Sequence, residues 1–175
     1  MFDSLVVQFV VLWAVIDPIG SIPVYLTKTV GLSVEDRRKI ARKAVMISAG
    51  ILIFFLIAGQ ALLEAMQIPL TAFQIAGGLV LLLFALTMIF GEGKPEQEIK
   101  LSSNLNELAV YPLAVPSIAS PGAMMAIVLL TDNHRFSLFD QTMTTLIMLS
   151  VLLITYLYSS PPTVFNAGLV TPAQR

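Results

Sequence analysis

Five long apolar stretches run along the chain, and a polar segment separates each from the next. They cover about residues 5–27, 44–66, 70–90, 109–131 and 142–158. A membrane-spanning helix needs about 17–25 mainly apolar residues to cross the hydrocarbon core of a bilayer. The pattern therefore predicts an all-α polytopic membrane protein, a helical bundle in which five spans are visible.

The first span is interrupted by polar and helix-breaking residues at Asp17, Pro18, Gly20, Ser21 and Pro23. A carboxylate at the centre of a span costs about 2.5–3.5 kcal/mol on insertion scales, so we expect Asp17 to face protein or water. A helix broken inside the membrane leaves backbone groups that are tolerated only in a protein interior or along a cavity. The interruption is typical of a transport site. The alternative is a kinked helix packed in the bundle, with Asp17 satisfied by its neighbours.

The fourth span contains a second interruption, formed by Pro112, Pro116, Ser120, Pro121 and Gly122. Because three spans separate the start of one broken span from the next, the two halves would enter the membrane with opposite orientation. Interrupted segments at corresponding positions of inverted repeats point to a transport site. We therefore predict a 3+3 inverted repeat, with a first repeat at 1–90, a loop at 91–108, a second and incomplete repeat at 109–158, and an atypical polar tail at 159–175.

The connections between the spans add local predictions. Ser33, followed by Glu35 and Asp36, is typical of a helix N-cap, so the second helix is expected to begin before it enters the membrane. Residues 67–69 predict a tight turn that makes the second and third spans an antiparallel hairpin. Small residues let helices approach closely, and the third span should pack through the face that carries Ala72, Ala76, Gly77 and Gly78. We expect Glu64 to be a solvated carboxylate at the end of its span.

Composition narrows the functional classes. The 175 residues are 57% hydrophobic and 12% charged, which is far more apolar than a soluble domain. The net charge of -1 gives no electrostatic basis for binding nucleic acid, and the absence of cysteine excludes disulfides and thiolate metal sites. His134 lies in a polar loop, where we expect it to be solvated. Asp17 has no second buried acid at a suitable position and no Ser–His pair lies in a span, so we expect no enzyme, metal or cofactor.

Basic residues predict the orientation in the membrane. Residues 28–43 carry six of the ten Lys and Arg residues and 91–108 carry two more, whereas 67–69 carry none. Positive charge collects on the cytoplasmic side. The N-terminus is therefore predicted to start outside and the chain to reach the cytoplasm after the fifth span. No basic n-region precedes the first span, so we expect it to be retained and not removed as a signal peptide.

Several motifs resemble the MarC family of bacterial inner-membrane proteins. They lie at residues 16–24 (IDPIGSIPV), 37–39 (RRK), 73–78 (FQIAGG), 111–116 (YPLAVP) and 120–122 (SPG), in family order, and the resemblance covers about residues 5–158. It implies six spans, an outside N-terminus, an inner-membrane location and distant similarity to LysE-type exporters. The family admits Asn at the position of Asp17 and usually has Gly at that of Ser120. Its members continue into a sixth helix, whereas this chain turns into Ser-Ser-Pro-Pro at 159–162, so we expect a truncated or frameshifted end.

These observations favour a secondary transporter or exporter of a small polar solute. Asp17, Ser21 and Ser120 would bind the solute, and the breaks would be shaped by Pro18, Gly20, Pro23, Pro116, Pro121 and Gly122. The alternative is a non-transporting membrane protein of structural or other role. The expected partners are the lipid bilayer, the solute and, because a missing sixth helix would expose a packing face, further copies of the chain.

Overall fold

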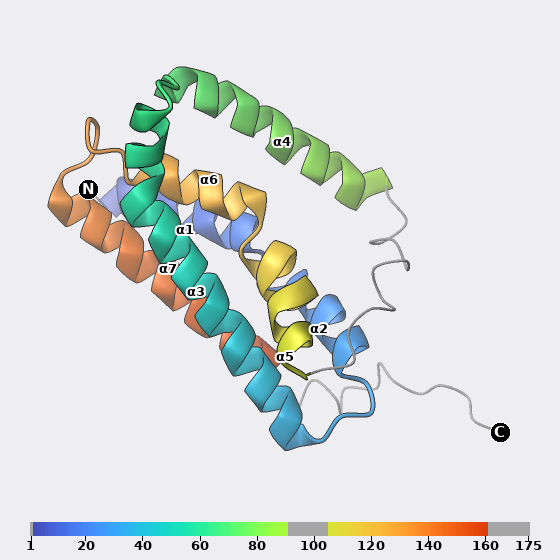
Figure 1. Cartoon of the computed structure of the whole chain (residues 1–175). Helices are drawn as coiled ribbons and strands as arrows, with labels where there is room; N and C mark the ends of the chain where they lie inside the picture. Colours follow the sequence, from blue (N-terminus) through green and yellow to red (C-terminus); the bar gives the residue numbers. More distant parts are fainter. Residues whose placement is uncertain (1, 91–104, 161–175) are drawn as a thin grey trace.

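The computed structural model describes residues 2–90 and 105–160, and all of its elements are helical (Figure 1). In chain order they are α1 (Phe2–Ile16), α2 (Ser21–Thr29), α3 (Val34–Ala65), α4 (Leu70–Phe90), α5 (Leu105–Leu108), the irregular helical segment η2 (Ala109–Ile118), α6 (Pro121–Leu130) and α7 (Leu138–Ser159). The predicted all-α membrane architecture is confirmed. The predicted tail at 159–175 lies almost wholly outside the described residues.

Several of the described helices are long and apolar enough to cross a membrane. Residues Leu5–Thr29, Val34–Ala65 and Leu138–Ser159 each pass this test, and the bent pair Leu105–Ile118 with Pro121–Leu130 makes a fourth span. Among the described residues, Leu70–Val80 of α4 forms a further apolar helix that is shorter than a span. The predicted third span at 70–90 and the inverted repeat therefore remain predictions.

Both predicted interruptions are present. The first separates α1 from α2, which together still form one span of 25 residues. The second separates η2 from α6 and bends its span by 56°. A Pro lacks a backbone N–H and cannot continue the hydrogen-bond ladder of a helix, which explains why both interruptions occur beside prolines.

The second span begins where the sequence predicts. Ser33 caps α3, because its hydroxyl accepts a hydrogen bond from the backbone N–H of Asp36. The 32 residues of α3 exceed the thickness of a bilayer core, and its first turns carry exposed charges, including Lys39, which pairs with Glu35 at 2.9 Å. The polar start of α3 is therefore a solvated helical extension of the span.

The turn at 67–69 is present, but the hairpin packing differs from the prediction. Gln67 adopts a positive φ of 56° and reverses the chain. From there α4 leaves α3 at an angle and packs on α6 (Figure 1). Among the predicted packing face, only Gly77 is buried, where an added Cβ would lie 1.5 Å from Met125 Cε. Ala72, Ala76 and Gly78 are exposed.

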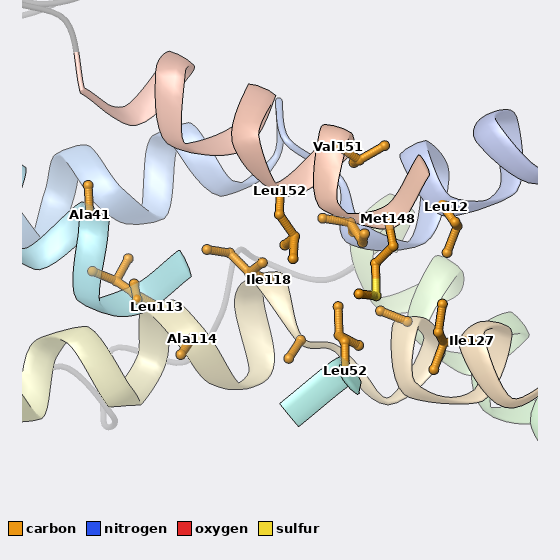
Figure 2. Close-up of a cluster of buried hydrophobic side chains, with 14 of the residues drawn as sticks. Leu12, Ala41, Leu52, Leu113, Ala114, Ile118, Ile127, Met148, Val151 and Leu152 are labelled. Atoms are coloured by element: carbon orange, nitrogen blue, oxygen red, sulfur yellow. The ribbon is translucent and has the colours of Figure 1, made fainter. Parts of the chain in front are cut away.

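The core lies where α1, α3, α6 and α7 converge. Figure 2 shows Leu12, Leu52, Ile127 and Met148 from these four helices facing one another, and each is at most 1% exposed. Large apolar side chains elsewhere point outward along α3, α4 and α7, including Ile57, Ile75 and Leu153. A soluble protein rarely exposes so much continuous apolar surface, so lipid is the solvent that this surface fits.

The predicted loop at 91–108 ends in helix. Its last four residues form α5, which runs directly into η2. Residues 91–104 lie outside the described part of the chain. The short loop after α6 also differs from a simple polar connection, because Asp132 is only 1% exposed.

Candidate functional site at the two helix breaks

The two interrupted spans meet at their breaks. The hydroxyl of Ser120 donates a hydrogen bond of 2.9 Å to the carbonyl oxygen of Val15. One turn away, the hydroxyl of Ser117 donates to that of Ser21 across 3.4 Å. In the same arrangement α1 packs beside α6, and α2 packs beside η2. The two spans therefore run in opposite directions and cross at the level of their interruptions.

Asp17 occupies the corner of the first break. Its φ of 49° lies in the left-handed region, which residues other than Gly, Asn and Asp rarely adopt. Its carboxylate Oδ1 accepts a hydrogen bond of 2.9 Å from the backbone N–H of Gly20. Its carbonyl oxygen accepts from both the backbone N–H and the hydroxyl of Ser21, at 3.1 and 2.9 Å. Asp17 therefore satisfies backbone groups at the interruption, and it stays half-buried.

Gly20 allows the Asp17 carboxylate to come this close. A Cβ at position 20 would lie 1.9 Å from Asp17 Oδ2, well inside van der Waals contact. Pro18 is buried beside it, whereas Pro23 lies exposed at the third residue of α2. Of the predicted break-forming residues in the first span, Pro18 and Gly20 thus shape the interruption, and Pro23 is accommodated in the first turn of the next helix.

The second break is built differently. Tyr111 and Val115, which precede Pro112 and Pro116, have extended backbone angles inside η2, as expected for residues followed by proline. Ser120 then caps α6, since its hydroxyl accepts from the backbone N–H of Ala123 at 3.0 Å, and Pro121 is the first residue of that helix. This is the position at which a helix tolerates proline best.

The structure brings together all three predicted binding residues. Ser21 and Ser120 are 4% and 2% exposed. Ser21 bonds to the carbonyl oxygen of Asp17, and Ser120 bonds to that of Val15, two residues before Asp17. Two further hydroxyls were missed. Ser117 could have been found because it directly follows Pro116 in the second interruption. Ser48 could not, since only the packing of α3 turns it towards the carbonyl oxygen of Ala114, 3.3 Å away.

The chemistry at the breaks is that of a hydrogen-bonding site. Hydroxyl groups both donate and accept, and the carboxylate of Asp17 accepts. Among residues 2–90 and 105–160, no group of three or more His, Asp or Glu side chains is placed to hold a metal ion. The groups at the breaks can therefore both donate and accept hydrogen bonds.

A second polar cluster closes the far end of the bundle. Asp132 Oδ1 accepts hydrogen bonds of 2.9 Å from Gln60 Nε2 and from the backbone N–H of His134. Gln60 Oε1 in turn accepts from the backbone N–H of Asn133 at 2.8 Å. Gln60 thus ties α3 to the loop between α6 and α7. The side chains of His134 and Glu64 are exposed nearby, as predicted, with Nε2 and Oε1 3.7 Å apart.

Comparison with known proteins agrees with this architecture. The sequence model described as MarC family integral membrane protein matches residues 2–169. A UPF0056 membrane protein of Methanocaldococcus jannaschii is 32% identical over 155 residues, which cover 87% of this chain and 75% of the relative. The UPF0056 membrane protein YvbG of Bacillus subtilis is 33% identical over 139 residues, covering 77% and 66%.

Relatives occur in both archaea and bacteria. A UPF0056 membrane protein of Aquifex aeolicus is 37% identical over 126 residues, covering 70% of this chain and 59% of the relative. The chain thus spans between 59% and 75% of the length of these three relatives. No solved structure matches it. With a family model matched over nearly its whole length and relatives above 30% identity, the chain belongs to the MarC family of integral membrane proteins.

Proposed function

We propose that this protein is a secondary transporter or exporter of a small polar solute, and that the solute binds where the two broken spans meet. The observation that carries the proposal is the pair of contacts from Ser120 to Val15 and from Ser117 to Ser21. These contacts place both interruptions at one level of the bundle. Discontinuous helices that converge near the midplane are how many transporters build a solute site.

The antiparallel crossing supports the same proposal. If the two halves are inverted repeats, rocking of one half against the other exposes a central site to each side in turn. Asp17 and the hydroxyls of Ser21, Ser117 and Ser120 favour a neutral or cationic solute that donates hydrogen bonds. An anionic solute would meet the carboxylate of Asp17 in a medium of low dielectric constant, which is unfavourable.

We further propose a bacterial inner-membrane location, an outside N-terminus and a cytoplasmic start of α3. The clustering of basic residues at 28–43 supports this orientation. Under it, the Gln60–Asp132 cluster lies on the outer side of the membrane, and the break site lies between that cluster and the cytoplasm.

One observation favours the alternative, a non-transporting membrane protein whose breaks serve packing. Asp17 Oδ1 and the hydroxyls of Ser21 and Ser120 each have a hydrogen-bond partner within the protein. A kink with a purely structural role also requires its polar groups to be hydrogen-bonded within the protein. Both functions therefore predict an ordered break, and only the movement of a solute separates them.

Reconstitution into proteoliposomes tests the proposal. Uptake of a panel of radiolabelled neutral and cationic amino acids and polyols is compared with that of protein-free liposomes. We expect saturable flux of at least one compound. This flux should be lower in Ser117→Val, because valine lacks the hydroxyl that contacts Ser21. Ser150→Val, which changes an exposed hydroxyl on α7, should leave flux unchanged. Absence of flux across the whole panel would favour the structural role.

A further inference from the structure

A buried amide in the outer half of the bundle has an unsatisfied oxygen. Gln8, Leu12 and Ile16 lie one turn apart on the buried face of α1, and Gln8 is only 3% exposed. Its Oε1 has no hydrogen-bond partner among the described residues. Buried polar groups are nearly always hydrogen-bonded, so an orphaned one needs an explanation. The most direct explanation is a hydrogen-bonding group that the protein itself does not provide.

The register of α6 and α7 against α1 places two further polar side chains at the level of Gln8. Leu12, Ile127 and Met148 face one another in the core (Figure 2). Helices α1 and α7 start at the same end of the bundle, and α6 runs towards that end (Figure 1). Gln8, Thr131 and Thr144 lie one helical turn closer to that end of the bundle than Leu12, Ile127 and Met148, respectively.

Both threonines are buried, and each keeps capacity for a further partner. Thr131 is 4% exposed and Thr144 is 0% exposed. Their hydroxyls donate to Ile127 O and Asp140 O, at 2.7 and 3.0 Å. A hydroxyl that donates once still offers its oxygen as an acceptor. Gln8 of α1, Thr131 at the C-cap of α6 and Thr144 of α7 thus each carry an oxygen that can accept a further hydrogen bond.

This level is separate from the helix breaks. The layer of Leu12, Leu52, Ile127 and Met148 lies between them, and all four side chains are at most 1% exposed. On the other side, Thr131 is directly followed by Asp132 of the cluster with Gln60. The polar level therefore lies between the apolar layer and the end of the bundle.

We propose that Gln8, Thr131 and Thr144 form a second site, here called the outer site, for a small group that donates hydrogen bonds. That group is the O–H of water or a hydroxyl or ammonium group of the solute. Where it is the solute, the inference rests on the proposed transport function, because the outer site is then a station on the path to the breaks. Where it is water, the site stands without transport.

Cysteine accessibility tests the outer site, and the chain has no cysteine of its own to interfere. Gln8→Cys is treated with a small water-soluble methanethiosulfonate reagent in vesicles of both orientations. Val7→Cys is the matched control, because Val7 is the next residue along α1 and is 58% exposed to the lipid-facing surface. Only a hydrated thiol forms the reactive thiolate, so Gln8→Cys should react at least about tenfold faster than Val7→Cys.

Failure to react from either side, or equal rates at the two positions, would overturn the proposal. Protection of Gln8→Cys by a compound of the flux panel would identify the solute as the ligand. Reaction that no compound slows would identify water. If the panel shows no flux while Gln8→Cys reacts, the transport proposal fails and the outer site remains.

Thermal unfolding of Gln8→Leu gives an independent readout in detergent. If Gln8 holds a hydrogen-bonding group, removing the amide loses that interaction, and Tm should stay the same or fall. If the site holds no such group, Leu replaces a buried amide oxygen that has no partner, and the protein becomes more stable. A rise in Tm would therefore contradict the outer site.

Discussion

At the scale of single residues, Asp17 carries the most information. Its carboxylate accepts from Gly20, its carbonyl accepts from Ser21, and its backbone sits at a positive φ of 49°. One residue thus ends α1, starts α2 and presents a half-buried acid at the break. A structural and a solute-binding role are compatible here, because only Oδ1 is engaged by Gly20.

Substitutions at Asp17 separate shape from charge. Asp17→Asn should be nearly neutral for stability, since the amide oxygen can accept from Gly20 and Asn tolerates the left-handed region. Asp17→Leu should lower the free energy of unfolding by about 1–3 kcal/mol, because it leaves the Gly20 N–H without a partner. Thermal unfolding in detergent measures both. Equal loss from the two variants would mean that the charge itself is required.

Gln60 provides a second test at this scale. Gln60→Met keeps the size but removes the donor to Asp132 and the acceptor for Asn133, and should cost about 1–3 kcal/mol in the free energy of unfolding. Gln60→Glu should cost more at pH 7, because it places a second carboxylate against Asp132 Oδ1. Denaturation in detergent ranks the two variants. A less damaging Gln60→Glu would contradict the contact between the side chain at position 60 and Asp132.

The sequence predicts break residues better than buried partners. Asp17, Ser21 and Ser120 stand out because polar residues beside prolines are conspicuous in an apolar run. Ser48 and Asp132 do not, because their burial follows from how α3 and α6 pack and from no local pattern. Asp132 in particular adjoins polar residues in the sequence and so suggested an exposed loop.

At the scale of elements, helix ends were predictable and helix packing was not. The cap at Ser33 and the interruptions at both broken spans follow from local rules of hydrogen bonding. The departure of α4 from α3 depends on contacts with α6, which are distant in the sequence. Small residues on α4 therefore drew attention to Gly77, whereas no local pattern pointed to Gly59 on α3, which also approaches α6 closely, with Val128 Cγ2 2.4 Å from an added Cβ.

Alanine substitutions of three glycines test these packing differences. Gly59→Ala should lower Tm, because the branched side chain of Val128 has little freedom to move away. Gly77→Ala should be milder, since the flexible end of Met125 can rotate aside. Gly50→Ala on the same helix as Gly59 meets no atom within 4 Å. It should be stabilising by about 0.5–1 kcal/mol.

Measurement of Tm in detergent for the three variants ranks them directly. A Gly59→Ala variant as stable as Gly50→Ala would show that α3 and α6 do not approach as closely as described. A Gly77→Ala variant worse than Gly59→Ala would show that the side chain of Met125 cannot move aside.

At the scale of the whole molecule, orientation in the membrane is open to direct measurement. Single cysteines at Ser33 and Asn133 lie in exposed turns at opposite ends of the bundle. With positive charge inside, an impermeant thiol reagent on intact cells should label Asn133→Cys and leave Ser33→Cys unlabelled until the cells are opened. Labelling of Ser33→Cys on intact cells would reverse the proposed topology.

The whole fold depends on two interrupted spans that cross in opposite directions and meet at their breaks. Sequence could place each break in its own span, but not bring them together, because their contact joins residues about a hundred positions apart. The inverted arrangement and the proposed solute site both depend on that contact.

The most direct measurement of this contact is disulfide formation between Ser21→Cys and Ser117→Cys. The two hydroxyl oxygens are 3.4 Å apart, so sulfur atoms at these positions need only a small movement to reach the S–S bond length of about 2.05 Å. Oxidation in membranes with copper phenanthroline, followed by a mobility shift that reductant reverses, should give an intramolecular cross-link. The pair Ser21→Cys and Ser150→Cys, with Ser150 on the exposed side of α7, should give none. Equal or no cross-linking in the two pairs would contradict the meeting of the two breaks.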